Sequence, residues 1–466
     1  MNRYRRRFLK AAAAGGLAYA FGRTPGTVSA QMSALNGYSD YRALVCLFLF
    51  GGNDSWNMLI PNTESEYAAY ARSRGAGTSS SLAIDRSMLL PISSAYPQSR
   101  SGAFGFHPSM PQMRDLFNAG NLAIVPNVGP LVRPTTKWQY QNAVAINHEL
   151  PPQLFSHNDQ QDQWHSLRGR RLLRTGWAGR IADVLGAQLG NQQIPLNISL
   201  FGQTFFQAGE RADPYVMGAG GVNMFEGLTY NEFERARRSR MESVLRATLD
   251  STSNSYYERG FARVQERALR YADRLNAAIA NAYSFSAFPS GRRSVLTTQL
   301  RTVARMISAR DSLSMSRQIF FVAAGGFDQH DRQMDEQPDL LADVSRSISA
   351  FQSAMVELGI SDKVTLFTQS DFGRTLTSNG DGSDHAWGGT QLVVGGAVAG
   401  GRLYGDYPLL EMDGPLEVGS GSFIPTVSSD QYATTLARWF GVSAENLSDI
   451  APNIVNFPDW DLGFMG

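Results

Sequence analysis

The feature that most constrains the fold is an uninterrupted apolar run near the start of the chain, Leu44-Val45-Cys46-Leu47-Phe48-Leu49-Phe50. Such a run without polar alternation is typical of a strand that helices cover on both faces, as in a parallel sheet. Cys46 is the only cysteine of the chain, so it has no partner for an internal disulfide. We therefore predict a buried strand over 42–50 and interpret Cys46 as a core residue rather than a catalytic thiol.

The rest of the chain alternates between apolar strands and amphipathic helices. Further strands are predicted over 122–125, 318–323, 364–368 and 391–394, and helices over 110–119, 296–307, 340–358 and 431–440. This alternation predicts an α/β fold with a doubly wound, mostly parallel sheet, which begins as strand, crossover helix, strand. Residues 62–105 are expected to form helix and loops, and residues 129–170 a polar functional connection.

One segment departs from this alternation. Residues 229–283 are rich in Arg and Glu, with apolar residues at helical spacing over 231–249 and 256–282. They predict a helical insertion, shaped as a hairpin, in a single domain over 31–466.

The N-terminus carries the pattern of an export signal. Arg5-Arg6-Arg7-Phe8-Leu9-Lys10 precedes an apolar stretch over 11–21, and Val28-Ser29-Ala30 follows as a small-residue cleavage site. This order predicts a twin-arginine signal peptide over 1–30, with the twin-arginine translocation machinery as a partner and a periplasmic or extracellular location. The alternative is a basic, disordered N-terminus. No later stretch is long and apolar enough for a stable membrane span.

The charge balance excludes an obvious nucleic-acid binder. The formal net charge is +1, and six of the 42 cations lie within residues 1–30, which hold no acid. The rest of the chain therefore carries 36 cations against 41 acids, too few for a basic face.

Acids and histidines gather in loops beside the predicted strands. The loops are Gly52-Asn53-Asp54-Ser55, Gly325 to Asp331, Ser370-Asp371-Phe372-Gly373-Arg374 and Asp384-His385-Ala386-Trp387-Gly388-Gly389. Ligands of open α/β sheets bind beyond the carboxyl ends of the strands, and carboxylates mixed with imidazoles suit a divalent metal ion. Each acid also has a structural alternative: Asp54 in a turn, Asp328 as a helix cap, and Asp371 paired with Arg374.

These loops carry a family resemblance. Together with Ser156-His157, Gln161-Asp162 and Thr175-Gly176-Trp177, they resemble the landmarks of a secreted, often twin-arginine-exported bacterial family, catalogued as domain of unknown function 1501. The similarity runs from about residue 40 to 445. More distantly, the chain resembles the alkaline phosphatase and sulfatase superfamily. That resemblance implies an alkaline-phosphatase-like core, metal ligands at the strand exits and a nucleophile at a helix start.

The resemblance also implies a ligand set. Its metal-binding positions correspond to Asp54, Asp328, His330, Asp371 and His385. Phe372 stands where the superfamily has a histidine, so one of two metal sites loses its imidazole, and a single ion fits better. The cofactor is a divalent metal ion, with Zn, Mn, Mg and Ca all open.

The candidate nucleophile is inferred separately, from the residues around each Ser and Cys. No Cys or Ser has the Cys/Ser-x-Pro-x-Arg flank of a sulfatase of the usual kind. Ser156 precedes a polar segment with a helical start, where orphan amides bind anions, although it could be only an N-cap. Ser55 is a weaker alternative. His157 and Arg374 are expected to steady the anion, and His165 could line the pocket, whereas His107 and His148 are interpreted as structural.

The leading hypothesis is an exported, metal-dependent hydrolase acting on an anionic phosphate or sulfate ester. The alternative is a non-enzymatic exported protein that has a structural or vestigial metal site and binds an unknown protein partner. A third hypothesis is a metal-free serine hydrolase using Ser156, although no Gly-x-Ser-x-Gly elbow supports it.

Overall fold

The computed structural model describes residues 40–94, 102–167, 174–186, 188–189, 194–222, 243–244, 247, 255–291 and 293–466. The predicted signal peptide lies outside the described residues, as does nearly all of the first half of the predicted helical hairpin.

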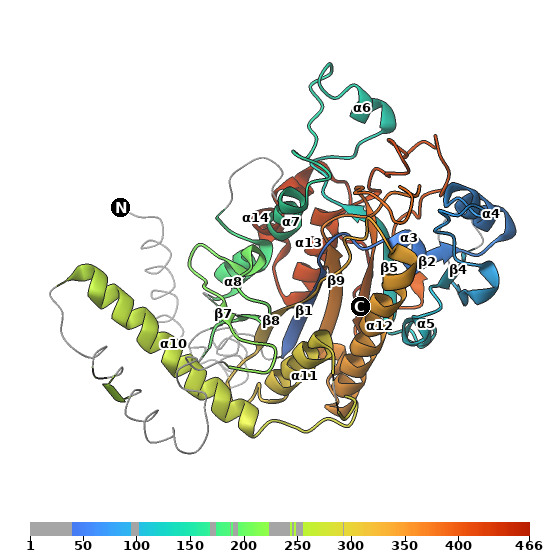
Figure 1. Cartoon of the computed structure of the whole chain (residues 1–466). Coiled ribbons are helices and arrows are strands. Elements are labelled where there is room, and N and C mark those ends of the chain that lie inside the picture. The colour runs from blue at the N-terminus through green and yellow to red at the C-terminus, as the bar shows by residue number, and fades with distance from the viewer. Residues whose placement is uncertain are drawn as a thin grey trace, which may run out of the picture.

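A nine-stranded sheet forms the centre of the molecule, in the order β11-β5-β10-β9-β1-β8-β6-β7, with β12 beside β5 (Figure 1). Its strands are β1 (Arg42–Leu49), β5 (Leu122–Gly129), β6 (Asn197–Ser199), β7 (Tyr215–Val216), β8 (Arg317–Ala324), β9 (Val364–Ser370), β10 (Gly389–Gly395), β11 (Arg402–Leu403) and β12 (Val427–Ser428). The prediction of an α/β fold with a mostly parallel sheet is confirmed.

The apolar run of the sequence is the central strand β1. It pairs in parallel with β8 on one side and β9 on the other, and all of its residues except Arg42 are buried. Cys46 is fully buried, and burial raises the pKa of its thiol well above the ordinary value. A thiol held in its neutral form is a poor nucleophile, which agrees with a core role.

Helices cover both faces of the sheet. Alternate side chains of β1 therefore pack into two different hydrophobic cores, one on each face. Ala43, Val45 and Leu47 pack in the core with α5 (Pro111–Asn118), α11 (Val295–Ser308) and α12 (Gln333–Glu357). Leu44, Cys46 and Phe48 pack in the core with α8 (Trp177–Gly186), α13 (Ser429–Phe440) and α14 (Leu447–Ile450). Figure 1 shows the two helix layers on either side of the strands.

One strand of the centre runs against the others. β10 is antiparallel to both β9 and β5, so β5 runs parallel to β1, with β9 and β10 between them. The expectation that residues 122–125 belong with β1 to a parallel sheet is confirmed, although the two strands are not neighbours. This reversal places the amino end of β10 at the same end of the sheet as the carboxyl ends of β1, β8 and β9. Residues just before β10 can therefore meet residues that follow the other three strands.

Two segments differ from the predicted elements. Residues 62–105, expected as helix and loops, also hold strands β3 (Leu90–Ser93) and β4 (Ala103–Phe106), which form a small antiparallel sheet with β2 (Leu59–Pro61) in the order β2-β4-β3. Helix α12 begins at Gln333, seven residues before the predicted 340. Gln333 and Gln337, in this added part, donate hydrogen bonds to Asp54, and apolar periodicity does not reveal such contacts.

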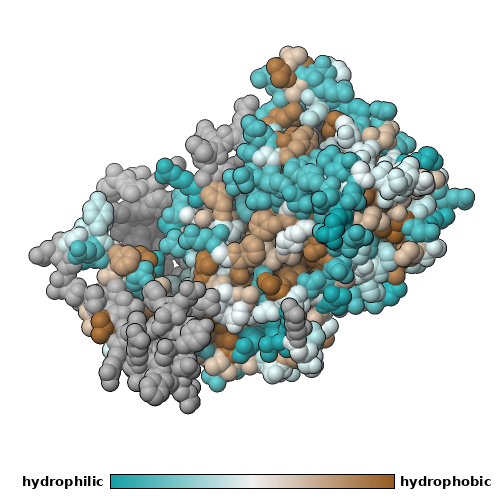
Figure 2. Space-filling model, in the orientation of Figure 1, coloured by the Kyte–Doolittle hydropathy of each residue, from teal (hydrophilic) through white to brown (hydrophobic). Residues whose placement is uncertain are grey.

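The remaining elements connect these layers. They are α3 (Ser55–Met58), β2 (Leu59–Pro61), α4 (Glu64–Ser73), η1 (Arg86–Met88), β3 (Leu90–Ser93), β4 (Ala103–Phe106), α6 (Lys137–Gln141), α7 (His157–Ser166), η2 (Phe205–Gln207), α10 (Tyr256–Ala280), η5 (Ser361–Lys363), η6 (Ala444–Asn446) and η7 (Pro452–Asn456). Within the described ranges, none of the helices has the length and apolarity needed to span a bilayer. Figure 2 shows a mainly hydrophilic surface over the start of α12, beside the loops that follow the strands.

Candidate metal centre

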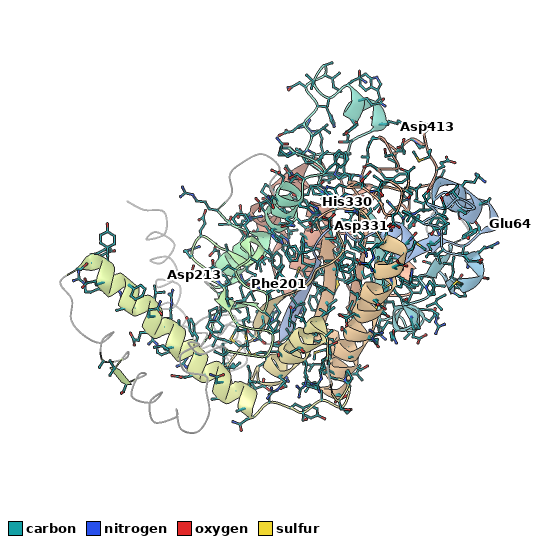
Figure 3. All side chains as sticks on the ribbon, viewed as in Figure 1. Glu64, Phe201, Asp213, His330, Asp331 and Asp413 are labelled. Carbon is teal, nitrogen blue, oxygen red and sulfur yellow. The ribbon has the colours of Figure 1, made fainter. Side chains whose placement is uncertain are left out.

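Three histidines surround the carboxylate of Asp328, which follows β8: His157 at the start of α7, His330 on the same loop as Asp328, and His385 before β10. Its Oδ1 lies 3.1 Å from Nε2 of His330 and 3.3 Å from Nε2 of His385, and its Oδ2 lies 3.4 Å from Nε2 of His157. Ligand atoms of His157, Asp328 and His385 lie within 4.8 Å of one another, close enough to share one ion. Figure 3 shows His330 and Asp331 on the loop that leads into α12.

His157, the first residue of α7, is oriented by a buried carboxylate. Its Nδ1 lies 2.6 Å from Oδ2 of Asp371, which also accepts a hydrogen bond from Nε2 of Gln161 at 2.8 Å. The other carboxylate oxygen accepts from the backbone N–H of Gly51 at 3.2 Å. Because a carboxylate only accepts, Nδ1 of His157 carries a proton, and its Nε2 is directed toward Oδ2 of Asp328. That Nε2 is buried without a hydrogen-bond partner among the described residues.

His385 is oriented by a backbone carbonyl. Its Nδ1 donates to the backbone carbonyl of Phe155 at 2.8 Å, and its Nε2 faces Oδ1 of Asp328 at 3.3 Å. Burial, followed by the charges of His157, Arg374 and His330, lowers the pKa of His385 despite the hydrogen bond to Phe155. A neutral imidazole is the form that binds metal ions.

His330 completes the cluster from the solvent side. Its Nε2 lies 2.8 Å from Nε2 of His385, and its Nδ1 lies 3.1 Å from Oδ1 of Asp384. Two ring nitrogens at this distance cannot both carry a proton. At least one of them therefore carries no proton.

Arg374 holds Asp328 in its charged form. Partial burial alone would raise the pKa of Asp328, but the hydrogen bond and charge of Arg374, with the charges of His157 and His330, lower it overall. The guanidinium is fully buried, and its nitrogens contact Asp328 at 2.8 Å, the carbonyl of Gly51 at 3.3 Å and Ser383. Arg374 therefore faces Asp328 rather than solvent, and it does not form the alternative pair with Asp371.

The structure does not bring Asp54 into this group. Its carboxylate caps α3 and contacts Nη2 of Arg74 at 2.5 and 2.7 Å, and it accepts from Nε2 of Gln333 at 2.5 Å. The two charged side chains are 1% or less exposed. These contacts occupy the carboxylate within a buried ion pair.

Ser156 lies at the start of α7, as the helical pattern predicts. It is half-buried, and its hydroxyl donates to Oδ2 of Asp159 at 2.5 Å rather than capping the helix amides. Ser55 is buried, and its hydroxyl accepts from the backbone N–H of Thr390 at 2.9 Å.

The other histidines lie apart from the cluster. His165 packs among Phe48, Phe206 and Phe321, and burial lowers its pKa to about 3. His107 is buried with its pKa lowered to about 4 by desolvation, and Nε2 of His148 contacts the Thr135 hydroxyl at 2.9 Å.

The donor set fits a divalent metal ion. Imidazole nitrogens mixed with a carboxylate oxygen suit Zn²⁺ and related ions, and fixed Nδ1 partners are the usual way of aiming such imidazoles. The specific observation behind this fit is Nε2 of His157, which is buried, has no hydrogen-bond partner among the described residues and lies 3.4 Å from Oδ2 of Asp328. Sequence reasoning did not find the contacts of Phe155, Gln161 and Asp384, although the Gln161-Asp162 pair was among the recognised landmarks.

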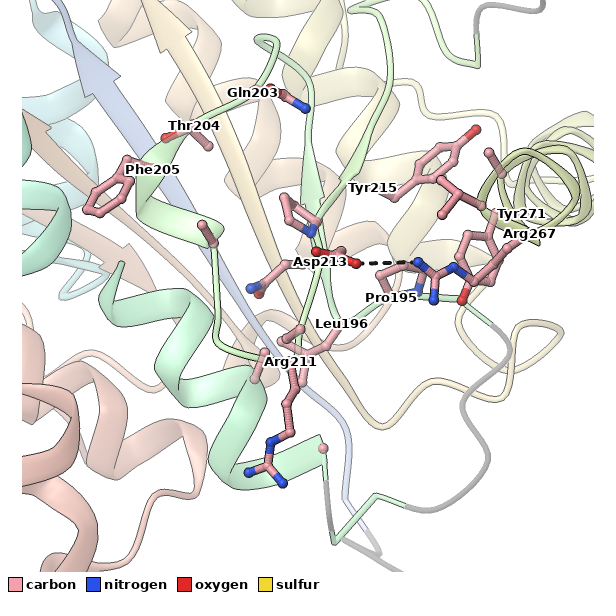
Figure 4. Close-up of a pocket in the computed structure, with 18 residues that line it drawn as sticks. Pro195, Leu196, Gln203, Thr204, Phe205, Arg211, Asp213, Tyr215, Arg267 and Tyr271 are labelled. Atoms are coloured by element: carbon pink, nitrogen blue, oxygen red, sulfur yellow. Dashed lines mark hydrogen bonds and ion pairs between the residues drawn. The ribbon is translucent and has the colours of Figure 1, made fainter. Parts of the chain in front are cut away.

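A large cavity lies away from the cluster. It has a volume of about 780 Å³ and is lined by residues of α8, β6, β7 and α10 and of the loops between them (Figure 4). Asp213 and Arg267 form an ion pair at 3.3 Å at its wall. No residue of the metal cluster lines it.

The chain belongs to the family described as "Protein of unknown function (DUF1501)", whose model matches residues 41–418. Solved structures similar to it include the PsFucS1 sulfatase from Pseudoalteromonas sp., at 12% identity and a TM-score of 0.35, with 91% of this chain and 73% of that chain covered. The lipoteichoic acid synthase LtaP from Listeria monocytogenes matches at 8% identity and a TM-score of 0.35, covering 91% and 77%. The alkaline phosphatase from the Antarctic bacterium TAB5 matches at 9% identity and a TM-score of 0.27, covering 77% and 93%. No curated protein matches the chain.

Proposed function

We propose that this protein is an exported hydrolase of phosphate or sulfate esters that uses one divalent metal ion held by His157, Asp328 and His385. The observation that carries the proposal is the convergence of their ligand atoms within 4.8 Å, with Nε2 of His157 buried and lacking a hydrogen-bond partner in the part of the chain that the structure describes. When bound, such an ion supplies Lewis-acid polarisation of the ester oxygen. His330 lies at the rim, where it can serve as a fourth ligand or act on the substrate.

The chain's own residues provide the rest of the chemistry. Ser156 is the proposed nucleophile, because it precedes α7 and its hydroxyl already donates to Oδ2 of Asp159 at 2.5 Å. The free amides at the start of α7 favour an anion at this position. His330, held by Asp384 at 3.1 Å, is positioned to give a proton to the leaving oxygen. In this assignment, Asp371 and Arg374 orient His157 and Asp328 and do not touch the substrate.

Metal analysis together with an ester panel tests this function. Protein purified without chelators should hold about one divalent ion per chain and melt at a lower temperature after chelation, because the ion binds the native state. The ion-loaded protein should hydrolyse members of a panel of nitrophenyl phosphate and sulfate esters. Absence of bound metal and of any thermal shift with Zn²⁺, Mn²⁺, Mg²⁺ or Ca²⁺ would contradict the metal assignment. Metal binding without hydrolysis would favour the non-enzymatic alternative.

Export is the second part of the proposal, and it rests on the sequence of residues 1–30. Replacing Arg5 and Arg6 together with Lys should leave the full-length precursor in the cytoplasm, because the twin-arginine signal is lost. Fractionation of cells that express each form measures this. Normal export of the double variant would show that another route carries the protein.

A further inference from the structure

We propose that Gln160 is a positioning residue of the metal centre, because its buried carboxamide holds the turn at Phe155 whose carbonyl aims His385. The inference rests on the proposed metal site and adds to it a residue that touches neither the ion nor the substrate. It follows from a strained backbone, a buried hydrogen bond and the position of one carbonyl.

The backbone at Phe155 is strained. Its φ is +72°, in the left-handed region that residues with a Cβ atom rarely adopt. This conformation is unfavourable for a residue other than glycine because its Cβ atom crowds the backbone, so neighbouring contacts must maintain it.

Gln160 supplies the contact that maintains this turn. Its Oε1 accepts the backbone N–H of Phe155 at 2.5 Å, and its side chain is fully buried. The residue is itself fixed by α7, where its backbone N–H donates to the carbonyl of Ser156 at 2.9 Å. The turn is thereby tied to the first residues of the helix.

The turn controls two of the three proposed ligands. The carbonyl of Phe155 accepts from Nδ1 of His385 at 2.8 Å, which leaves Nε2 of His385 facing Asp328 at 3.3 Å. His157 follows only two residues later, at the start of α7. If the turn relaxes, the carbonyl rotates away, and Nδ1 of His385 loses the partner that sets its tautomer.

Gln163 offers a matched control on the same helix. It is also buried, and its Nε2 donates to the carbonyl of Pro152 at 2.6 Å, so it secures the same loop without contacting Phe155. Gln160→Met and Gln163→Met each replace a carboxamide by a side chain of similar length and lose one hydrogen bond. Competition of each purified protein with a chromogenic chelator for Zn²⁺ measures affinity, and the visible spectrum of Co²⁺-loaded protein reports ligand geometry.

Gln160→Met should weaken Zn²⁺ binding by about 10–100-fold, the usual effect of losing a residue that orients a ligand, and should change the Co²⁺ spectrum. Gln163→Met should stay within about twofold of the parent, as expected of an uncoupled site. In a Phe155→Gly background, the further change Gln160→Met should cost much less, because glycine adopts the left-handed conformation without strain. Equal affinity losses for the two Gln variants, or an undiminished loss in the Phe155→Gly background, would overturn the inference.

A metal-free measurement separates this inference from the proposed function. With ¹⁵N-labelled histidine, NMR should show His385 protonated at Nδ1 in the metal-free parent and as a mixture of tautomers in Gln160→Met. If the parent binds no metal, the proposed function fails, and this tautomer change still decides the positioning role. An unchanged His385 tautomer in Gln160→Met would refute the role of Gln160 whether or not metal binds.

Discussion

The Nδ1 atom of His157 lies 2.6 Å from the Oδ2 atom of Asp371, and this aspartate is fully buried at the end of β9. The contact turns Nε2 of His157 toward Asp328. Asp371 therefore acts on the candidate metal centre through an imidazole, and its other contacts, to Gln161 and to the Gly51 amide, hold it in place.

Asp371→Asn should weaken metal binding by about 10–100-fold, because the amide no longer fixes the tautomer of His157. Chelator competition at constant pH measures the affinity. Asp311→Asn is the control, since that carboxylate is 87% exposed and lies outside the cluster. Parent-like affinity in Asp371→Asn would show that His157 does not need this partner or is not a ligand.

Ser156→Ala should abolish ester hydrolysis while the metal remains bound. The free energy of unfolding should fall by only about 1 kcal/mol, because the variant loses one hydrogen bond, the one to Asp159. His385→Ala should lose metal and activity together, because a ligand is removed. Turnover and metal content of the two variants are measured side by side. Parent-like turnover in Ser156→Ala would show that Ser156 is not the nucleophile and would point to water or Ser55 instead.

Arg74→Met should destabilise the protein without a direct effect on the metal. It leaves Asp54 charged, buried and unpaired, and breaking such a pair typically costs about 3–5 kcal/mol. Urea unfolding of the metal-free protein measures the loss, and Zn²⁺ affinity is measured where the variant is still folded. A specific loss of affinity exceeding that of Asp311→Asn would indicate that Asp54 belongs to the metal site after all.

His165 should make stability depend on pH. Burial lowers its pKa from the ordinary 6.5 to about 3, so the folded state keeps it neutral where the unfolded chain binds a proton. Its stabilising contribution is complete above pH 6.5 and falls as the pH decreases toward 3, by about 2 kcal/mol between pH 7 and pH 5.

His165→Leu removes this titration. The free energy of unfolding of the variant should therefore decrease less than that of the parent over the same interval, and denaturant unfolding at each pH measures the difference. Parallel pH profiles for the two proteins would mean that His165 titrates normally in the folded state.

Local patterns in the sequence determined much of the fold. The apolar run of β1, the strands β8 and β9, and the helices α10, α11 and α13 lie where hydrophobic periodicity places them, because burial of an apolar face is a local signal. The loop motifs indicated that acids and histidines gather beside the strand ends. The resemblance of these motifs also indicated the family to which the chain belongs.

The tertiary structure alone decided which of these side chains meet. His385 reaches the cluster because β10 runs antiparallel to β9, and a strand's direction depends on its neighbours rather than on its own residues. Asp54 pairs with Arg74 and Gln333, whereas Asp328 meets three imidazoles, although both follow strands and are chemically identical. A carboxylate can form a buried ion pair or bind a metal ion. Which of the two it does depends on the partner that packing brings within about 3 Å of it.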